Sequence, residues 1–184
     1  RCRPMSYYYF AATLPMLMPD QPPPFSVADF RTQCESHLAP GDLAALDAIL
    51  GAQPSATPHP FLRRWHRADG QLRNALARTR AERMRQDAAD HIREIEGYEP
   101  AMEDAVREAY ARPNPLQREK AIDHIRWDTL EALAGMDPFA SSALLAYGVQ
   151  LTILERWARM DKDTGAATVE TLVQRTPADE EAKQ

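Results

Sequence analysis

Residues 137–165 read DPFASSALLAYGVQLTILERWARMDKDTG, and this stretch decides the fold. Asp137 and Pro138 form a helix-start signal, because they combine a good N-cap residue with proline at the first helical position. No charged residue occurs from residue 138 to residue 154, and the leucine, isoleucine and valine side chains fall on nearly every side of a helix. A helix that is apolar all round is normally buried. The stretch therefore predicts a central helix that other helices cover.

The same stretch becomes charged at residue 155. Glu155, Arg156, Trp157 and Arg159 follow directly on the apolar half. Glu155 and Arg159 have the i, i+4 spacing of a favourable intrahelical ion pair, which would make this segment a solvated helix end. Tryptophan and arginine are also favoured anchors at protein interfaces, so the segment could instead dock on a partner. Both interpretations stay open at the level of sequence.

The totals are those of an ordinary soluble protein, with 184 residues, 44% hydrophobic and 27% charged. A net charge of −5 argues against a general nucleic-acid binder. Cys2 and Cys34 suffice neither for a disulfide framework nor for a metal site, which favours a reducing cytoplasmic location. The uncharged run at 138–154 is shorter than the ~20 mostly apolar residues of a membrane span and contains serine, threonine and glutamine. We expect a buried helix there.

Cap and turn signals divide the N-terminal third. Residues 6–17, SYYYFAATLPML, favour a short helix, although three consecutive tyrosines would also suit a strand. Residues 19–25, PDQPPPF, predict a stiff extended connector. Ser26 and Asp29 approximate a capping box at the start of the next helix. A turn at residues 40–42 leads into another short helix, which would complete a helical hairpin.

A long arginine-rich helix should begin at Pro60. Its apolar seam has a period near 3.5 and comprises Phe61, Trp65, Ala68, Leu72, Ala75 and Thr79. Residues 61–85 contain eight arginines and two acids, a net charge of +6, whereas residues 87–108 contain eight acids and two arginines, a net charge of −6. The chain is therefore electrically divided, and the sequence does not decide whether the two segments pair with each other or face different partners.

The remaining breaks predict two further helices before the central one. Gly97 and Pro100 favour a helix that restarts at residue 100. Asn114 and Pro115 give the next helix an N-cap and a first residue, and Gly135 ends it.

The predicted fold class is all-α, a multi-helix bundle of about six to eight helices with a Pro-rich connector near the N-terminus and a disordered C-terminal tail. Residues 1–5 should be a non-native or disordered leader and residues 174–184 a disordered acidic tail. Residues 6–173 should form one helical domain, or two lobes divided as 6–58 and 59–173.

No catalytic or metal-binding motif is recognisable. The five histidines contain no i, i+4 pair and no HExxH, and GxSxG, P-loop and GxGxxG patterns do not occur. His91 beside Asp87 and Asp90, or His124 beside Asp123 and near Glu119, could form an acid–base pair. Side chains adjacent in sequence on a helix diverge by about 100°, so Asp123 and His124 make a poor dyad. Both histidines are better interpreted as surface residues. We expect no enzyme activity, no catalytic or metal-binding residue and no cofactor.

The helix at 61–85 is the best candidate for nucleic-acid binding, because aromatic side chains interleave with arginines as base stacking and phosphate contacts require. The arginines of this alternative are Arg63, Arg64, Arg67, Arg73 and Arg78. Phe61 and Trp65 share the apolar seam, however, so they are better interpreted as core residues. The arginines are then a solvated or partner-facing surface.

Several stretches resemble a bacterial family of uncharacterised proteins associated with V/A-type rotary ATPases. They are SYYYFAATLPML (6–17), EKAIDHIRWDTLEAL (119–133), DPF (137–139), LLAY (144–147), LTILERW (151–157) and MDKDTG (160–165). The resemblance covers residues 6–173 and is most specific over residues 119–165.

A weaker likeness is to the protein that forms the central stalk of these machines. The residues that match the last helices of this stalk protein are Phe139, Ala146, Tyr147, Glu155 and Arg156. The stalk protein is an all-helical spacer between the rotor shaft and the membrane ring, without a catalytic centre or cofactor. The present chain is much shorter than that three-lobed protein, and its arginine-rich helix has no counterpart there.

The resemblance implies a non-catalytic structural or coupling subunit, or an assembly factor, of a V/A-type proton- or sodium-translocating ATPase. It would lie at the cytoplasmic face of the membrane, bind the rotor shaft and the membrane ring through its helices, and touch the membrane only indirectly. The residues expected to bind these partners are Tyr147, Glu155, Arg156, Trp157, Arg159, Arg63, Arg64 and Arg67.

Overall fold

The structure is a computed structural model that describes residues 7–51, 59–97 and 99–160. These residues form seven α-helices and one short 3-10 helix, and they contain no strand, which confirms the all-α fold class. The helices are α1 (Tyr8–Thr13), α2 (Val27–Glu35), α3 (Pro40–Ile49), α4 (Pro60–Met84), η1 (Ala89–His91), α5 (Pro100–Ala111), α6 (Pro115–Ala134) and α7 (Ser141–Arg159). The predicted leader (1–5) and tail (174–184) lie outside the described residues.

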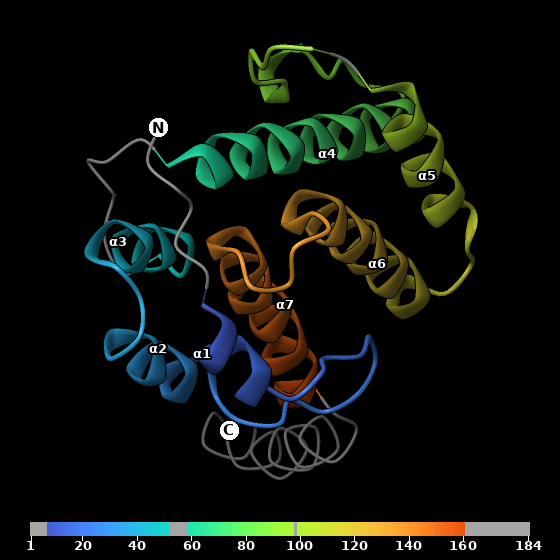
Figure 1. The fold of residues 1–184 in the computed structure, drawn as a ribbon. Coiled ribbons are helices and arrows are strands. Elements are labelled where there is room, and N and C mark those ends of the chain that lie inside the picture. Colours follow the sequence, from blue (N-terminus) through green and yellow to red (C-terminus); the bar gives the residue numbers. More distant parts are fainter. Residues whose placement is uncertain (1–6, 52–58, 98, 161–184) are drawn as a thin grey trace, which may run out of the picture.

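Helix α7 lies at the centre of the arrangement, between the α2–α3 pair and α6 (Figure 1). Its buried residues are Leu144, Leu145, Ala146, Gly148, Val149, Leu151 and Leu154. The predicted burial of the uncharged half is therefore confirmed. None of the described helices is long and apolar enough to cross a membrane.

The start of α7 differs from the prediction. The helix begins at Ser141, three residues after Pro138, and Ala140 is its N-cap. Asp137 instead accepts a hydrogen bond from the Phe139 amide, at 2.9 Å, in a turn that precedes the helix. The Phe139 carbonyl accepts the Tyr7 amide at 2.8 Å. Residues 137–140 therefore form the α6–α7 connection, which bonds through Phe139 to the residue before α1 and does not extend α7.

Most of the other helix boundaries agree with their local signals. The short N-terminal helix α1 is present, and Ser26 and Asp29 form a capping box at the start of α2. Proline stands at the first position of α4 and α6, and the Asn114 side chain caps α6. Gly135 follows α6 with φ of +82°, a conformation that glycine adopts without strain.

Between α4 and α5 the chain forms a loop that packs back on α4. Helix α4 ends where Arg85 takes the left-handed conformation, with φ of +54°. The Asn74 side chain donates to the Arg93 carbonyl at 2.8 Å and accepts from the Arg93 amide at 3.0 Å. Ile95 lies so close over Gly70 that an added Cβ there would overlap it. The Gln71 side chain also donates to the Glu96 carbonyl at 3.3 Å, so three hydrogen bonds and an apolar contact hold the loop to α4.

Two hydrophobic cores share α4 and α6. The larger core joins α1, α2, α3 and α7 with the first turns of α4 and the end of α6. The smaller core joins α5 with the second half of α4 and the first half of α6. Because Phe61, Leu62 and Trp65 belong to the larger core, apolar contacts cross the boundary proposed between residues 58 and 59.

Candidate docking surfaces

The charged end of α7 makes most of its contacts within the chain. Asp123 on α6 is only 4% exposed and accepts three side-chain hydrogen bonds. The donors are Arg126 at 2.8 Å, the Trp157 indole at 2.7 Å and Arg156. A buried carboxylate needs such donors, because an unpaired buried charge is costly. We name these four residues the Asp123 network; it joins the end of α7 to the middle of α6.

Glu155 and Arg159 form the predicted i, i+4 ion pair, at 2.6 Å. Glu155 is half-buried and also accepts a hydrogen bond from the Val27 amide, at 3.3 Å, at the start of α2. Arg159 is exposed. Of the four charged-end residues predicted to bind partners, only Arg156 and Arg159 are therefore largely open to solvent.

Tyr147 belongs to an aromatic cluster on the other half of α7. Its ring centroid lies 5.0 Å from that of Phe30 and 6.3 Å from that of Phe25. Its hydroxyl donates to the Pro15 carbonyl at 3.0 Å. Burial raises the pKa of Tyr147 to about 12. The half-buried Tyr147 thus holds the chain that follows α1 against α7.

The basic helix α4 presents only part of its charge to solvent. Arg63, Arg64 and Arg67 lie exposed in its first half, as expected for a solvated or partner-facing surface. Arg73 instead pairs with Asp69 at 2.7 Å, and Arg78 pairs with Glu103 on α5. Within the described residues, Arg78–Glu103 is the one salt bridge that connects the +6 and −6 segments.

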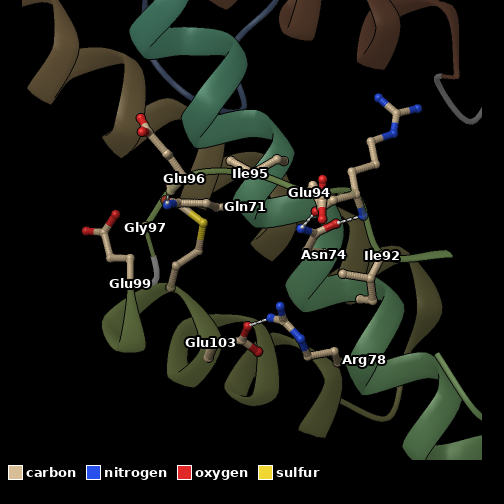
Figure 2. Close-up of a pocket in the computed structure, with 12 residues that line it drawn as sticks. Gln71, Asn74, Arg78, Ile92, Glu94, Ile95, Glu96, Gly97, Glu99 and Glu103 are labelled. Atoms are coloured by element: carbon tan, nitrogen blue, oxygen red, sulfur yellow. Dashed lines mark hydrogen bonds and ion pairs between the residues drawn. The ribbon is translucent and has the colours of Figure 1, made fainter. Parts of the chain in front are cut away.

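The acidic loop and α5 form a pocket of about 530 Å³ against α4 (Figure 2). Its lining includes four carboxylates, which are Glu94, Glu96, Glu99 and Glu103. Figure 2 shows Arg78 paired with Glu103 on one side and the Asn74 side chain bonded to the loop on the other. The sequence showed the acidic run but not this enclosure, which depends on the loop folding back over Gly70.

A second, mostly apolar groove of about 430 Å³ lies along the first two turns of α7, and we name it the α7 groove. Its lining residues are Ala11, Leu14, Pro15, Met16, Leu17, Glu131, Ala134, Gly135, Pro138, Ala143, Leu144, Ala146, Tyr147 and Gln150. They come from three places: the end of α1 with the chain after it, the end of α6 with the α6–α7 connection, and α7 itself. Among them, Tyr147 is the one residue that the sequence predicts to bind a partner.

Large apolar side chains are exposed on the chain segments that form the α7 groove. Met136, between two lining segments, is 100% exposed, and Met16 in the lining is 85% exposed. Tyr9 is 87% exposed, and its neighbour Tyr8 packs on Phe139 with ring centroids 4.6 Å apart. Five of the eight large apolar side chains exposed in the described chain belong to residues 8–18 or to Met136. Such clustering is a usual mark of a protein interaction site, whereas scattered exposed apolar residues are not.

One polar cluster was missed at the level of sequence. The buried Tyr7 hydroxyl donates to Asp42, and the other oxygen of Asp42 lies 3.0 Å from His59 Nε2. The remaining ring nitrogen of His59 accepts the Phe61 amide at 3.2 Å, so His59 caps α4. Burial together with the Asp42 hydrogen bond raises the pKa of Tyr7 to about 12. Every polar atom of this cluster has a partner, and the cluster joins α1, α3 and α4.

Within the described residues, neither histidine considered for acid–base chemistry forms a hydrogen bond or ion pair through its ring with the acids paired with it in the sequence. His91 is exposed in η1. His124 Nε2 lies 3.0 Å from Asp20 in the Pro-rich connector, whereas Asp123 accepts from Arg126, Arg156 and Trp157. In the described part of the chain, no three histidine, cysteine or acidic side chains come together as metal ligands.

Comparison with protein families gives one match. Residues 102–179 are similar to a family described as "Protein of unknown function (DUF2764)". The matched region is less than half of the chain and includes α6, α7 and the whole of residues 119–165, where the resemblance seen in the sequence is most specific. The likeness to an uncharacterised family is thus supported, and the family description names no partner. No curated protein and no solved structure matches the chain.

Proposed function

We propose that this protein is a non-catalytic structural or coupling subunit, or an assembly factor, of a bacterial V/A-type rotary ATPase, and that it acts at the cytoplasmic face of the membrane. The observation that carries the proposal is the set of exposed tyrosine and methionine side chains on the chain segments that form the α7 groove. Aromatic and methionine side chains are enriched at protein interfaces. The choice of partner rests on the resemblance of residues 6–17 and 119–165 to proteins associated with these ATPases.

A coupling subunit must keep its shape when its partners exert force, and the fold suits that requirement. The Asp123 network joins α6 to α7, and the Arg126 guanidinium also lies 3.5 Å from Asp69 on α4. The pair of hydrogen bonds between Asn74 and Arg93 holds the acidic loop on α4. Three long helices are therefore connected by polar contacts in addition to their shared cores.

The proposal is tested by affinity capture. Full-length tagged protein, expressed in its own host and extracted in mild detergent, should recover rotor-shaft or membrane-ring subunits of the ATPase. Absence of all ATPase subunits, in low salt and in high salt, would refute the proposal. Deletion of the gene that encodes the protein should also lower the amount of assembled ATPase on native gels. An unchanged amount would exclude the assembly role.

The exposed arginines favour one rival function. Arg63, Arg64 and Arg67 lie within about one turn of α4 and are all solvent-exposed, so they could contact nucleic-acid phosphates. Arg73 and Arg78, the other candidates, already have acidic partners. A gel shift with single- and double-stranded RNA and DNA at ~50 mM salt tests the idea. Binding that weakens steeply with salt and vanishes in the triple Arg→Ala variant would favour the rival over the ATPase role.

A further inference from the structure

We infer that the α7 groove is the docking site for an amphipathic helix of a partner protein, with an apolar face and flanking lysine or arginine residues. The inference deepens the proposed function and rests on it for the identity of the partner protein. The shape, polarity and charge of the groove each support this occupant.

The shape of the groove suits a short helical segment. Its floor on α7 runs from Ala143 to Gln150, which is about 10 Å of helix. Two turns of a second helix laid along this floor would present apolar side chains at positions i, i+3 or i+4, and i+7, the usual anchors of a helix in a groove.

The polarity of the walls fits an apolar face. One part of the lining carries Leu14, Met16 and Leu17, and another carries Gly135 and Pro138 of the α6–α7 connection, between which Met136 is fully exposed. Methionine side chains are flexible and polarisable, so they adapt to apolar partners of irregular shape. An occupant that covers Met16 and Met136 would remove from water two of the most exposed apolar side chains of the described chain.

The charge of the rim selects a basic partner. Glu131 is the one charged residue in the lining, Asp128 lies one turn before it on α6, and Asp137 is exposed in the α6–α7 connection. None of the three takes part in a salt bridge with another described residue. Glu131 accepts the Trp127 indole at 2.9 Å, which fixes its carboxylate at the groove edge. Three acids beside an apolar groove attract lysine and arginine and repel acidic segments.

The test uses two synthetic 18-residue peptides with leucine on one helical face and either lysine or glutamate on the other. Binding to the full-length protein is measured by fluorescence anisotropy. The lysine peptide should bind at least 10-fold more tightly than the glutamate peptide. Met16→Lys with Met136→Lys should weaken lysine-peptide binding by 10-fold or more, because it replaces apolar contact with repulsion. Glu131→Gln keeps the acceptor for Trp127 and should weaken binding about 3-fold, which is the effect expected from losing one solvent-exposed charge pair.

Met84→Lys is the matched control. Met84 is also an exposed methionine, and it lies at the end of α4, where a positive charge is favourable. Equal loss in this control and in the groove variant would overturn the inference, because it would indicate non-specific attraction to the whole protein. Sedimentation that reveals a dimer abolished by Met16→Lys with Met136→Lys would also overturn it, since the occupant would then be a second copy.

The two proposals can fail separately. If affinity capture recovers ATPase subunits equally with wild-type protein and with the Met16→Lys, Met136→Lys variant, the proposed function stands and the groove inference fails. If the lysine peptide binds as expected but no ATPase subunit is recovered, the groove inference stands and the proposed function fails.

Discussion

Replacing Asp123 with alanine removes the acceptor that three side chains of two helices share. Arg126 and Trp157 would lose their hydrogen bonds at 2.8 and 2.7 Å, and Arg156 would lose its carboxylate partner. The indole N–H of Trp157 and the guanidinium of Arg126 would be left without this acceptor at the α6–α7 contact. We expect a clear loss of stability without a change of fold, because the apolar residues of both helices still pack in the same way.

The magnitude follows from the burial of each partner. A hydrogen bond to a charged group contributes about 1.5–3 kcal/mol, and the Trp157 bond is of this kind. The Arg126 and Arg156 side chains are 21% and 45% exposed, so water screens their attraction to Asp123 and each contributes about 1 kcal/mol or less. The expected decrease in the free energy of unfolding is therefore about 2–4 kcal/mol. For a chain of this length that corresponds to a decrease in Tm of roughly 5–15 °C.

Urea denaturation followed by circular dichroism measures this change. Asp123→Asn keeps an oxygen acceptor for Trp157 and should lose about half as much stability. Arg159→Ala is the control at the same end of α7, because its exposed pair with Glu155 should contribute less than about 0.5 kcal/mol. If the free energy of unfolding of Asp123→Ala is within 0.5 kcal/mol of the wild-type value, the Asp123 network does not stabilise the fold. Arg156 and Trp157 would then be free to act as docking residues.

Three further predictions concern other parts of the fold. Gly148→Ala should lower the free energy of unfolding by about 1–2 kcal/mol, because a Cβ there would lie 2.8 Å from Leu46 and 3.3 Å from Phe30. At Gly41 an added Cβ has nothing within 4 Å, so Gly41→Ala should be neutral or stabilising by up to about 0.5 kcal/mol. Parallel thermal melts that give the same sign for both variants would contradict this. The pKa of Tyr147 is about 12 in the folded state, so above pH 10 the unfolded chain releases this proton first, and stability should fall from pH 10 to 12. Tyr147→Phe should make that fall shallower in urea titrations, and an unchanged slope would mean that the tyrosine titrates alike in both states. Burial also raises the pKa of Cys34 to about 12, so a thiol reagent at pH 8 should modify it only as fast as the protein unfolds; rapid labelling of the folded protein at this residue would contradict its burial.

The helices could be predicted from the sequence where a local signal had no competitor. Ser26, Pro60 and Gly135 mark real boundaries because capping hydrogen bonds, the missing proline N–H and a positive φ act within a few residues. Asp137 and Pro138 gave an equally good signal, yet α7 starts at Ser141, because the Phe139 carbonyl bonds to an amide that is 132 residues distant in sequence. A contact between residues so far apart in the chain produces no periodic pattern in the sequence.

The surfaces were harder to predict for the same reason. A run of charge such as residues 155–159 indicates that polar partners are needed, but not whether the chain itself provides them. The buried carboxylate that accepts from Arg156 and Trp157 belongs to Asp123 on α6, 33 and 34 residues away in sequence. In the sequence, Asp123 stands out only as the neighbour of His124, with which it would make a poor acid–base pair. The walls of the α7 groove likewise come from residues 11–17, from the end of α6 and from α7. Only the packed helices bring such residues together.

The two ends of α7 therefore differ in how readily they can bind a partner. At its C-terminal end, the donors of Arg156 and Trp157 are already paired with Asp123, so a partner that binds there through these donors must compete with a formed, partly buried network. At its N-terminal end, Met16 and Met136 remain in water beside an open apolar groove. Covering them breaks no existing contact and gains the free energy of apolar burial, about 25 cal/mol per Å². Docking should consequently start at the N-terminal half of α7, and a partner long enough to reach the C-terminal end would meet the exposed Arg159 there.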